Sequence, residues 1–78
     1  MRIKQLRLIV TFHTTTAAMA MEKICAEKGV PGRLIPVPRD ITAGCGMSWS
    51  APVEARAAIE KTVLEFGIET DGWYELMV

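Results

Sequence analysis

The chain has few of the residues that metal sites and nucleic-acid surfaces require. Its 78 residues include one His and two Cys, with no CxxC pair and no Cys/His cluster. Four ligands for a structural zinc ion are therefore not at hand, and we expect no metal. Nine Lys and Arg balance nine Asp and Glu, and no basic run is present. A nucleic-acid partner is not expected, because such binding needs a basic patch.

Long apolar runs are also missing. The longest stretches, residues 8–10 and 17–21, are far shorter than the roughly 20 residues that cross a bilayer. The first residues lack the apolar core and cleavage site of a signal peptide. We therefore expect no membrane partner and a cytoplasmic location, where reducing conditions favour free thiols over a disulfide.

Half of the residues are hydrophobic, which is enough for one core, and we expect a single domain over residues 1–78. Apolar residues alternate with others over residues 6–12, as is typical of a strand with one face toward a core. Residues 14–16 offer hydroxyl caps for a helix that Gly29 ends. Residues 33–37 predict a short strand that its prolines push to a sheet edge.

The second half repeats this order. Residues 38–46 predict a long loop without periodicity, and residues 47–50 a short strand. Pro52 suits the first turn of a second helix, and Gly67 ends that helix. Residues 73–78 predict the last strand. The apolar stripe of the second helix is formed by Ala55, Ala58, Ile59, Thr62, Val63 and Phe66.

The element order βαββαβ predicts an α+β, ferredoxin-like sandwich. Its four-stranded antiparallel sheet has the order 4-1-3-2, with two helices on one face. This topology brings the end of the first strand, the start of the first helix and the 38–46 loop to one edge. We expect Ile9, Trp49 and Trp73 on the uncovered face, where a second copy would hide them in a homodimer.

Cys45 lies in this loop between Gly44 and Gly46. Two neighbours without side chains let a partner approach the sulfur closely, and the thiolate is its nucleophilic form. Arg39 and the start of the first helix favour the thiolate over the thiol, and His13 is placed to orient or protonate it. The same Gly-flanked Cys is also compatible with a simple tight turn.

The other residues near this edge have plainer interpretations. Cys25 lies on the apolar stripe of the first helix, so we expect it in the core and too far from the loop for a disulfide with Cys45. Thr14 and Thr15 mainly cap the helix. Their exposed amides would also suit an anion such as a persulfide or a selenide.

Four stretches together resemble one known family. They are residues 11–15, Glu22-Lys23, residues 33–39 and above all Gly44-Cys45-Gly46. Over nearly its whole length the chain is similar to the putative Se/S carrier protein-like family. Trp49 and the Ser50-Ala51 approach to the second helix depart from the pattern expected of that family, but these departures do not touch the thiol.

The resemblance implies that Cys45 is a carrier thiol. It would hold sulfur or selenium as a persulfide or selenopersulfide, with support from His13 and Arg39. The implied partners are a donor such as a cysteine desulfurase and an acceptor such as a selenophosphate synthetase or a sulfurtransferase. No cofactor beyond the carried atom is implied, and the chain is expected to act as a carrier rather than as a stand-alone enzyme.

Three other functions compete with this interpretation. A noncatalytic ferredoxin-like module for protein interaction or ligand sensing would use the open sheet face and tolerate replacement of Cys45, but not of Trp49 or Trp73. A metallochaperone would use Cys45 and His13, although it would lack the paired soft ligands of such proteins. A redox sensor would cycle Cys45 through sulfenic acid.

Overall fold

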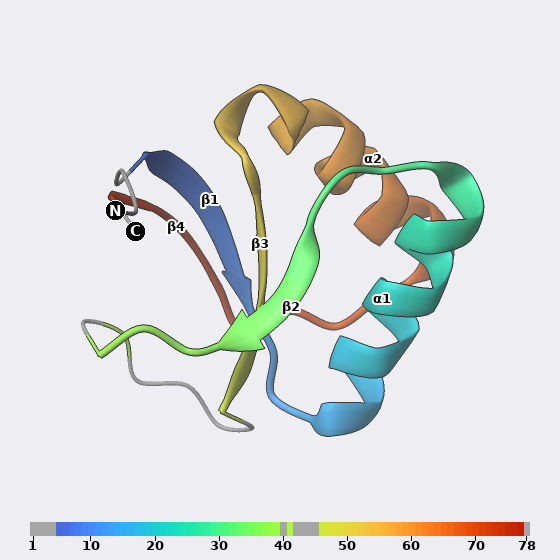
Figure 1. Ribbon diagram of the computed structural model, residues 1–78. Helices are drawn as coiled ribbons and strands as arrows, with labels where there is room; N and C mark the ends of the chain where they lie inside the picture. The colour runs from blue at the N-terminus through green and yellow to red at the C-terminus, as the bar shows by residue number, and fades with distance from the viewer. Residues whose placement is uncertain (1–4, 40, 42–45, 78) are drawn as a thin grey trace.

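The computed structural model describes residues 5–39, 41 and 46–77. These residues form a four-stranded sheet with two helices packed on one of its faces (Figure 1). In chain order the elements are β1 (Leu6–Thr11), α1 (Thr15–Lys28), β2 (Arg33–Pro36), β3 (Met47–Pro52), the short 3-10 helix η1 (Val53–Ala55), α2 (Arg56–Phe66) and β4 (Gly72–Met77).

The sheet has the order β2-β3-β1-β4, and each neighbouring pair is antiparallel. This is the predicted order read from the other edge, so the α+β prediction with its antiparallel sheet is confirmed. β1 is central, and its Val10 pairs with Trp49 of β3 and with Trp73 of β4. β2 is an edge strand, as its prolines predict.

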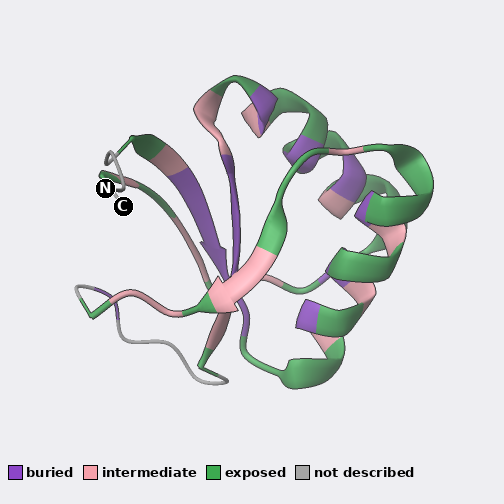
Figure 2. Cartoon of the chain, in the orientation of Figure 1, coloured by how far each residue is buried: buried purple, intermediate pink, exposed green. Residues whose placement is uncertain are grey.

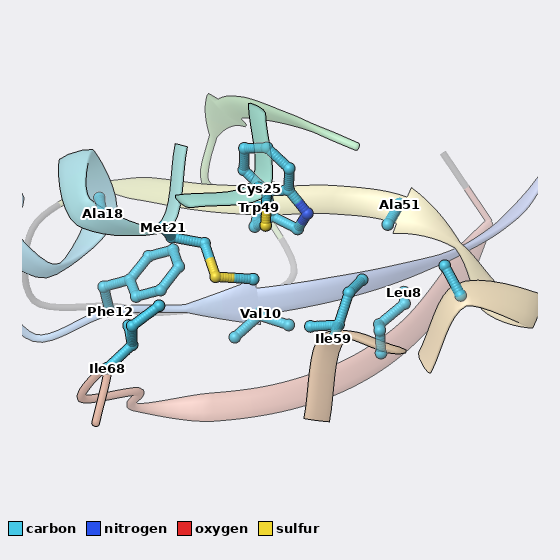
Figure 3. Close-up of a cluster of buried hydrophobic side chains, with 11 residues drawn as sticks. Leu8, Val10, Phe12, Ala18, Met21, Cys25, Trp49, Ala51, Ile59 and Ile68 are labelled. Carbon is cyan, nitrogen blue, oxygen red and sulfur yellow. The ribbon is translucent and has the colours of Figure 1, made fainter. Parts of the chain in front are cut away.

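The core lies between the sheet and the helices, and β1 supplies its centre. Leu8, Val10 and Phe12 alternate along the chain and are completely buried. Figure 3 shows them facing side chains of α1 and α2, among them Met21 and Ile59. The surfaces of the helices that turn away from the sheet are exposed (Figure 2). The period-2 pattern of the first strand therefore identifies the core face correctly.

The ends of α1 follow from local chemistry. Thr14 adopts an extended backbone, and its hydroxyl accepts a hydrogen bond of 3.1 Å from the amide of Ala17. Gly29 closes the helix in the left-handed conformation, at φ 71°, which a residue with a side chain adopts at a cost. The predicted cap and stop of this helix are both confirmed.

The predicted start of the second helix is wrong. Pro52 is the last residue of β3, with an extended backbone (φ −60°, ψ 144°), and α2 begins only at Arg56 after the turn of η1. Ile59 and Thr62 of the predicted stripe are buried, but Ala58 and Phe66 are exposed. Within α2, the buried residues of the predicted stripe are therefore Ile59 and Thr62.

The predicted orientation of the two tryptophans is also wrong. Trp49 is 3% exposed and belongs to the core cluster, and Trp73 packs against that cluster. Both pair with Val10, and residues paired across a sheet project from the same face, which here is the helix face. Ile9 projects from the opposite face as predicted, yet it is completely buried. The open face therefore lacks the two large aromatics that the module hypothesis assigned to it.

Candidate functional site

The loop between β2 and β3 is the predicted location of the site. Gly44 and Cys45 lie outside the described residues, whereas the two arms of the loop are described. The amide of Val37 donates a 3.0 Å hydrogen bond to the carbonyl of Gly46, which joins the arms. Gly46 has φ 78°, a left-handed conformation that glycine adopts without strain. Glycine next to Cys45 thus meets a backbone requirement at the base of the loop.

The described residues that follow β2, 37–39 and 41, extend on the side of the sheet away from the helices (Figure 1). Ile41 is only 8% exposed although it is not part of the core cluster, and its amide donates to the carbonyl of Pro38 at 3.0 Å. Ile9, Thr11 and Ser48 project from this same side and are completely buried. We infer that the arms of the loop cover this end of the sheet face, with Ile41 as the apolar contact.

The register of the sheet brings the other predicted residues to the same edge. Thr11 pairs with Ser48, so His13, two residues after Thr11, and Gly46, two residues before Ser48, both leave the sheet at this end. α1 also begins here (Figure 1). Among the described residues, His13, Gly46 and the start of α1 therefore lie at one edge of the sheet, as predicted from the topology.

His13 has a partner that the sequence analysis missed. Its Nε2 lies 3.3 Å from Oδ1 of Asp71, and 60% of its side chain is exposed. Asp71 is fixed by its own amide, which donates a 2.7 Å hydrogen bond to the carbonyl of Thr11. From the sequence, Asp71-Gly72 predicts only a turn. The signal that would have found this pair is the antiparallel return of β4 beside the end of β1.

The start of α1 contributes free amides and few competing charges. Thr14 uses its hydroxyl as the helix cap, and Thr15 is the exposed first residue of the helix. The first turn contains no acidic residue. The N-terminus of a helix carries a partial positive charge, so an anion at this edge would be stabilised.

Arg39 is exposed in the turn that follows β2. Within the described ranges no carboxylate pairs with its guanidinium, and the neighbouring Asp40 lies outside those ranges. Arg39 stands on the arm of the loop that leads toward Cys45 in the sequence. Its exposed guanidinium is a positive charge on the loop, as predicted from the sequence.

Cys25 has the opposite environment. Its side chain is completely buried in the core beside Met21 and Trp49 (Figure 3). Burial raises the pKa of its thiol, because the charged form loses hydration. A neutral, enclosed thiol is a poor nucleophile. The prediction that Cys25 packs in the core is confirmed, and the chain's remaining thiol is Cys45.

Two open pockets are lined by described residues outside the β2–β3 loop. The larger, of about 450 Å³, lies beside Trp73 and Arg56. The smaller, of about 310 Å³, lies between the end of α1 and α2. In the described part of the chain, no three His, Cys, Asp or Glu side chains gather as a metal site would require. No helix there is long and apolar enough to span a membrane.

Comparison with known proteins gives one match. The family model described as "Putative Se/S carrier protein-like" matches residues 7–75, from β1 into β4. No curated protein and no solved structure matches the chain. The matched range includes all four stretches that carry the resemblance seen in the sequence, together with Asp71.

Proposed function

The chain belongs to the Se/S carrier protein-like family, and we propose that it carries a sulfur or selenium atom on Cys45. The observation that carries this proposal is the contrast between the two thiols. Cys25 is sealed in the core, whereas Cys45 stands between two glycines in a loop whose arms lie outside the core. Transfer between proteins needs a thiol that a second active site can approach.

The proposed loading step is a thiol exchange. The Cys45 thiolate attacks the outer sulfur of a donor persulfide, the new S–S bond forms on Cys45, and the donor's S–S bond breaks. The donor leaves as a thiolate, so Cys45 is oxidised to the persulfide level and the donor is reduced to its thiol. Unloading is the same exchange with the acceptor's thiolate as attacker. A selenopersulfide follows the same balance with selenium as the outer atom.

The surrounding edge supports an anionic chain on Cys45. A persulfide is ionised near neutral pH, and the free amides at Thr14 and Thr15 together with Arg39 are donors suited to it. His13, oriented by Asp71, is the proposed proton donor or acceptor for the exchanging sulfur. These roles follow from the sheet register that brings His13 and the start of α1 to the base of the loop.

The proposed partners are proteins rather than small substrates. Cys45 lies between two glycines, which would let another protein approach the sulfur closely, so a donor such as a cysteine desulfurase would present its own active site to Cys45. A selenophosphate synthetase or a sulfurtransferase is the proposed acceptor. No other cofactor takes part in this scheme, which describes a carrier rather than a stand-alone enzyme. A reducing compartment such as the cytoplasm would keep Cys45 available. The strand order β2-β3-β1-β4 supports our proposal that the fold is ferredoxin-like.

The test is intact-mass spectrometry after incubation with a cysteine desulfurase and cysteine, and again with a selenium donor. We expect the wild type and Cys25→Ala to gain one sulfur or selenium atom that reductant removes. Cys45→Ser should gain none, while its circular dichroism and unfolding curve match the wild type. An adduct retained by Cys45→Ser, or absent from all three proteins, would contradict the proposal.

A further inference from the structure

The sheet face opposite the helices carries two arginines beside the end that the arms of the loop cover. In one row across the strands, Arg33 of β2 pairs with Ser50 of β3, Ser50 with Ile9 of β1, and Ile9 with Tyr74 of β4. In the next row, Arg7 of β1 lies between Pro52 and Leu76. We call the surface formed by Arg7, Arg33 and Tyr74 the arginine face; Ser50 lies buried beneath it.

The charge on this face has one sign. Arg7 and Arg33 are its charged side chains among the described strand residues. Every described acidic residue lies on a helix, in a connection, or on the helix side of β4, where Glu75 pairs with Arg56 at 2.9 Å. These residues are Glu22, Glu27, Glu54, Glu60, Glu65, Glu69, Asp71 and Glu75. Among the described residues, the carboxylates thus lie away from the face that carries Arg7 and Arg33.

No described carboxylate pairs with Arg7 or Arg33. The Nε of Arg7 donates a 3.2 Å hydrogen bond to the hydroxyl of Ser50, and Ser50 is the strand partner of Arg33. Unpaired guanidinium groups on a common face are ready to bind carboxylates bidentately. Arg39, also without a described carboxylate, extends the positive charge onto the loop.

We propose that the arginine face docks an acidic protein surface, that of the protein which exchanges the atom with Cys45. That this partner exchanges the atom with Cys45 rests on the proposed function. That the face binds an acidic protein surface does not. The described residues that follow β2, 37–39 and 41, lie on this side of the sheet (Figure 1), so a partner bound here would contact the arm that leads toward Cys45 in the sequence. Complementary charge would steer the encounter and set the register of the two proteins.

Other occupants fit the face less well. Single-stranded nucleic acid needs several exposed aromatic rings for stacking, but Tyr74 is 36% exposed and its hydroxyl lies over Gly72. A second copy packed face to face would bring two surfaces with the same positive charge together. This repulsion argues against the homodimer through the open face that the sequence analysis expected. An acidic protein surface needs no exposed aromatic rings for stacking and is attracted by the positive charge.

The test uses the Cys45→Ser variant, so that binding is measured without any sulfur transfer. Three probes are titrated into the isotope-labelled protein and followed by NMR: a short Glu-rich peptide, its Lys-for-Glu counterpart, and oligodeoxythymidine. We expect the Glu-rich peptide alone to shift amides of β1, β2 and β3 around the arginine face. Arg33→Glu should weaken its affinity roughly fivefold, and added salt should weaken it further.

Lys61→Glu is the matched control, because Lys61 is an exposed cation of α2 and the substitution changes the net charge equally. We expect less than about a twofold effect from it. Equal losses in the two variants, shifts confined to the helices, or no binding would overturn the docking proposal. Preferred binding of oligodeoxythymidine would replace it with a nucleic-acid surface. If the peptide binds as expected while Cys45 cannot be loaded, docking stands and the carrier function fails.

Discussion

Gly32 provides the sharpest structural prediction, because β2 depends on a close approach that only glycine permits. Gly32 precedes β2 and has φ 131°, which residues with a side chain rarely adopt. A Cβ atom built on it would lie 2.3 Å from Nε1 of Trp49 and 2.8 Å from the carbonyl oxygen of Ser50. The first atom belongs to a buried ring and the second to the backbone of β3, so neither moves away easily.

The magnitude of Gly32→Ala follows from two costs. The unfavourable φ costs about 1–3 kcal/mol, and forcing a methyl group against packed atoms costs about 1–3 kcal/mol more. Gly29→Ala is the matched control, since Gly29 has φ 71° but would place its Cβ in open space. We expect Gly29→Ala to lose about 1 kcal/mol and Gly32→Ala about 2–6 kcal/mol.

The assay is urea unfolding of the wild type and both variants, followed by circular dichroism and tryptophan fluorescence. Trp49→Phe provides a further check, because it removes the indole nitrogen that the new methyl group would meet. In that background Gly32→Ala should cost less than in the wild type. Losses for Gly32→Ala and Gly29→Ala that agree within about 0.5 kcal/mol would refute the packing argument.

Two further predictions concern the buried thiol and the loop. Burial raises the pKa of Cys25, so the thiol ionises at a lower pH in the unfolded chain than in the folded protein. The folded state therefore keeps this contribution to its stability below the ordinary thiol pKa and loses it as the pH rises above that value. Between pH 8 and pH 10 the unfolding free energy should fall more in the wild type than in Cys25→Ala, and an equal loss in both proteins would contradict this prediction. Ile41→Ala should cost about 2 kcal/mol and speed hydrogen exchange at Ile9, Thr11 and Ser48. Unchanged exchange there would show that Ile41 does not cover this face.

The elements of this fold could be predicted where local chemistry decides them. The alternation around Leu8 identified β1 and its core face, and a Thr cap and a Gly stop defined α1. Strand order followed from the sequence of elements. Each of these depends on residues close together in the chain.

Features set by tertiary packing were missed. Trp49 was expected on the open face, although the alternation of Ser48, Trp49 and Ser50 places the serines together and the indole on the core side. The complete burial of Ile9 on the open face was not predicted either, because it depends on groups distant in the sequence. The contact of His13 with Asp71 needs β4 to return beside β1, and it joins residues far apart in the sequence.

The site shows the same division. The motif around Cys45 was visible in the sequence, and the register confirms that His13 and Gly46 share one edge. Among the described residues, the position of the carboxylates away from Arg7 and Arg33 was not foreseen, because the zero net charge conceals it. Only the pairing of Arg33 with Ser50, and of Ser50 with Ile9, reveals that arginines from separate strands share one face.

The central claim is that Cys45 both accepts an atom and gives it up. The most direct measurement loads the Cys25→Ala variant with isotope-labelled sulfur, removes the donor, and adds cyanide. Cyanide attacks the outer sulfur of a persulfide and leaves as thiocyanate, which returns the cysteine to its thiolate. We expect one equivalent of labelled thiocyanate and recovery of the unloaded mass. Label that stays on the protein, or that Cys45→Ser releases equally, would contradict the carrier function.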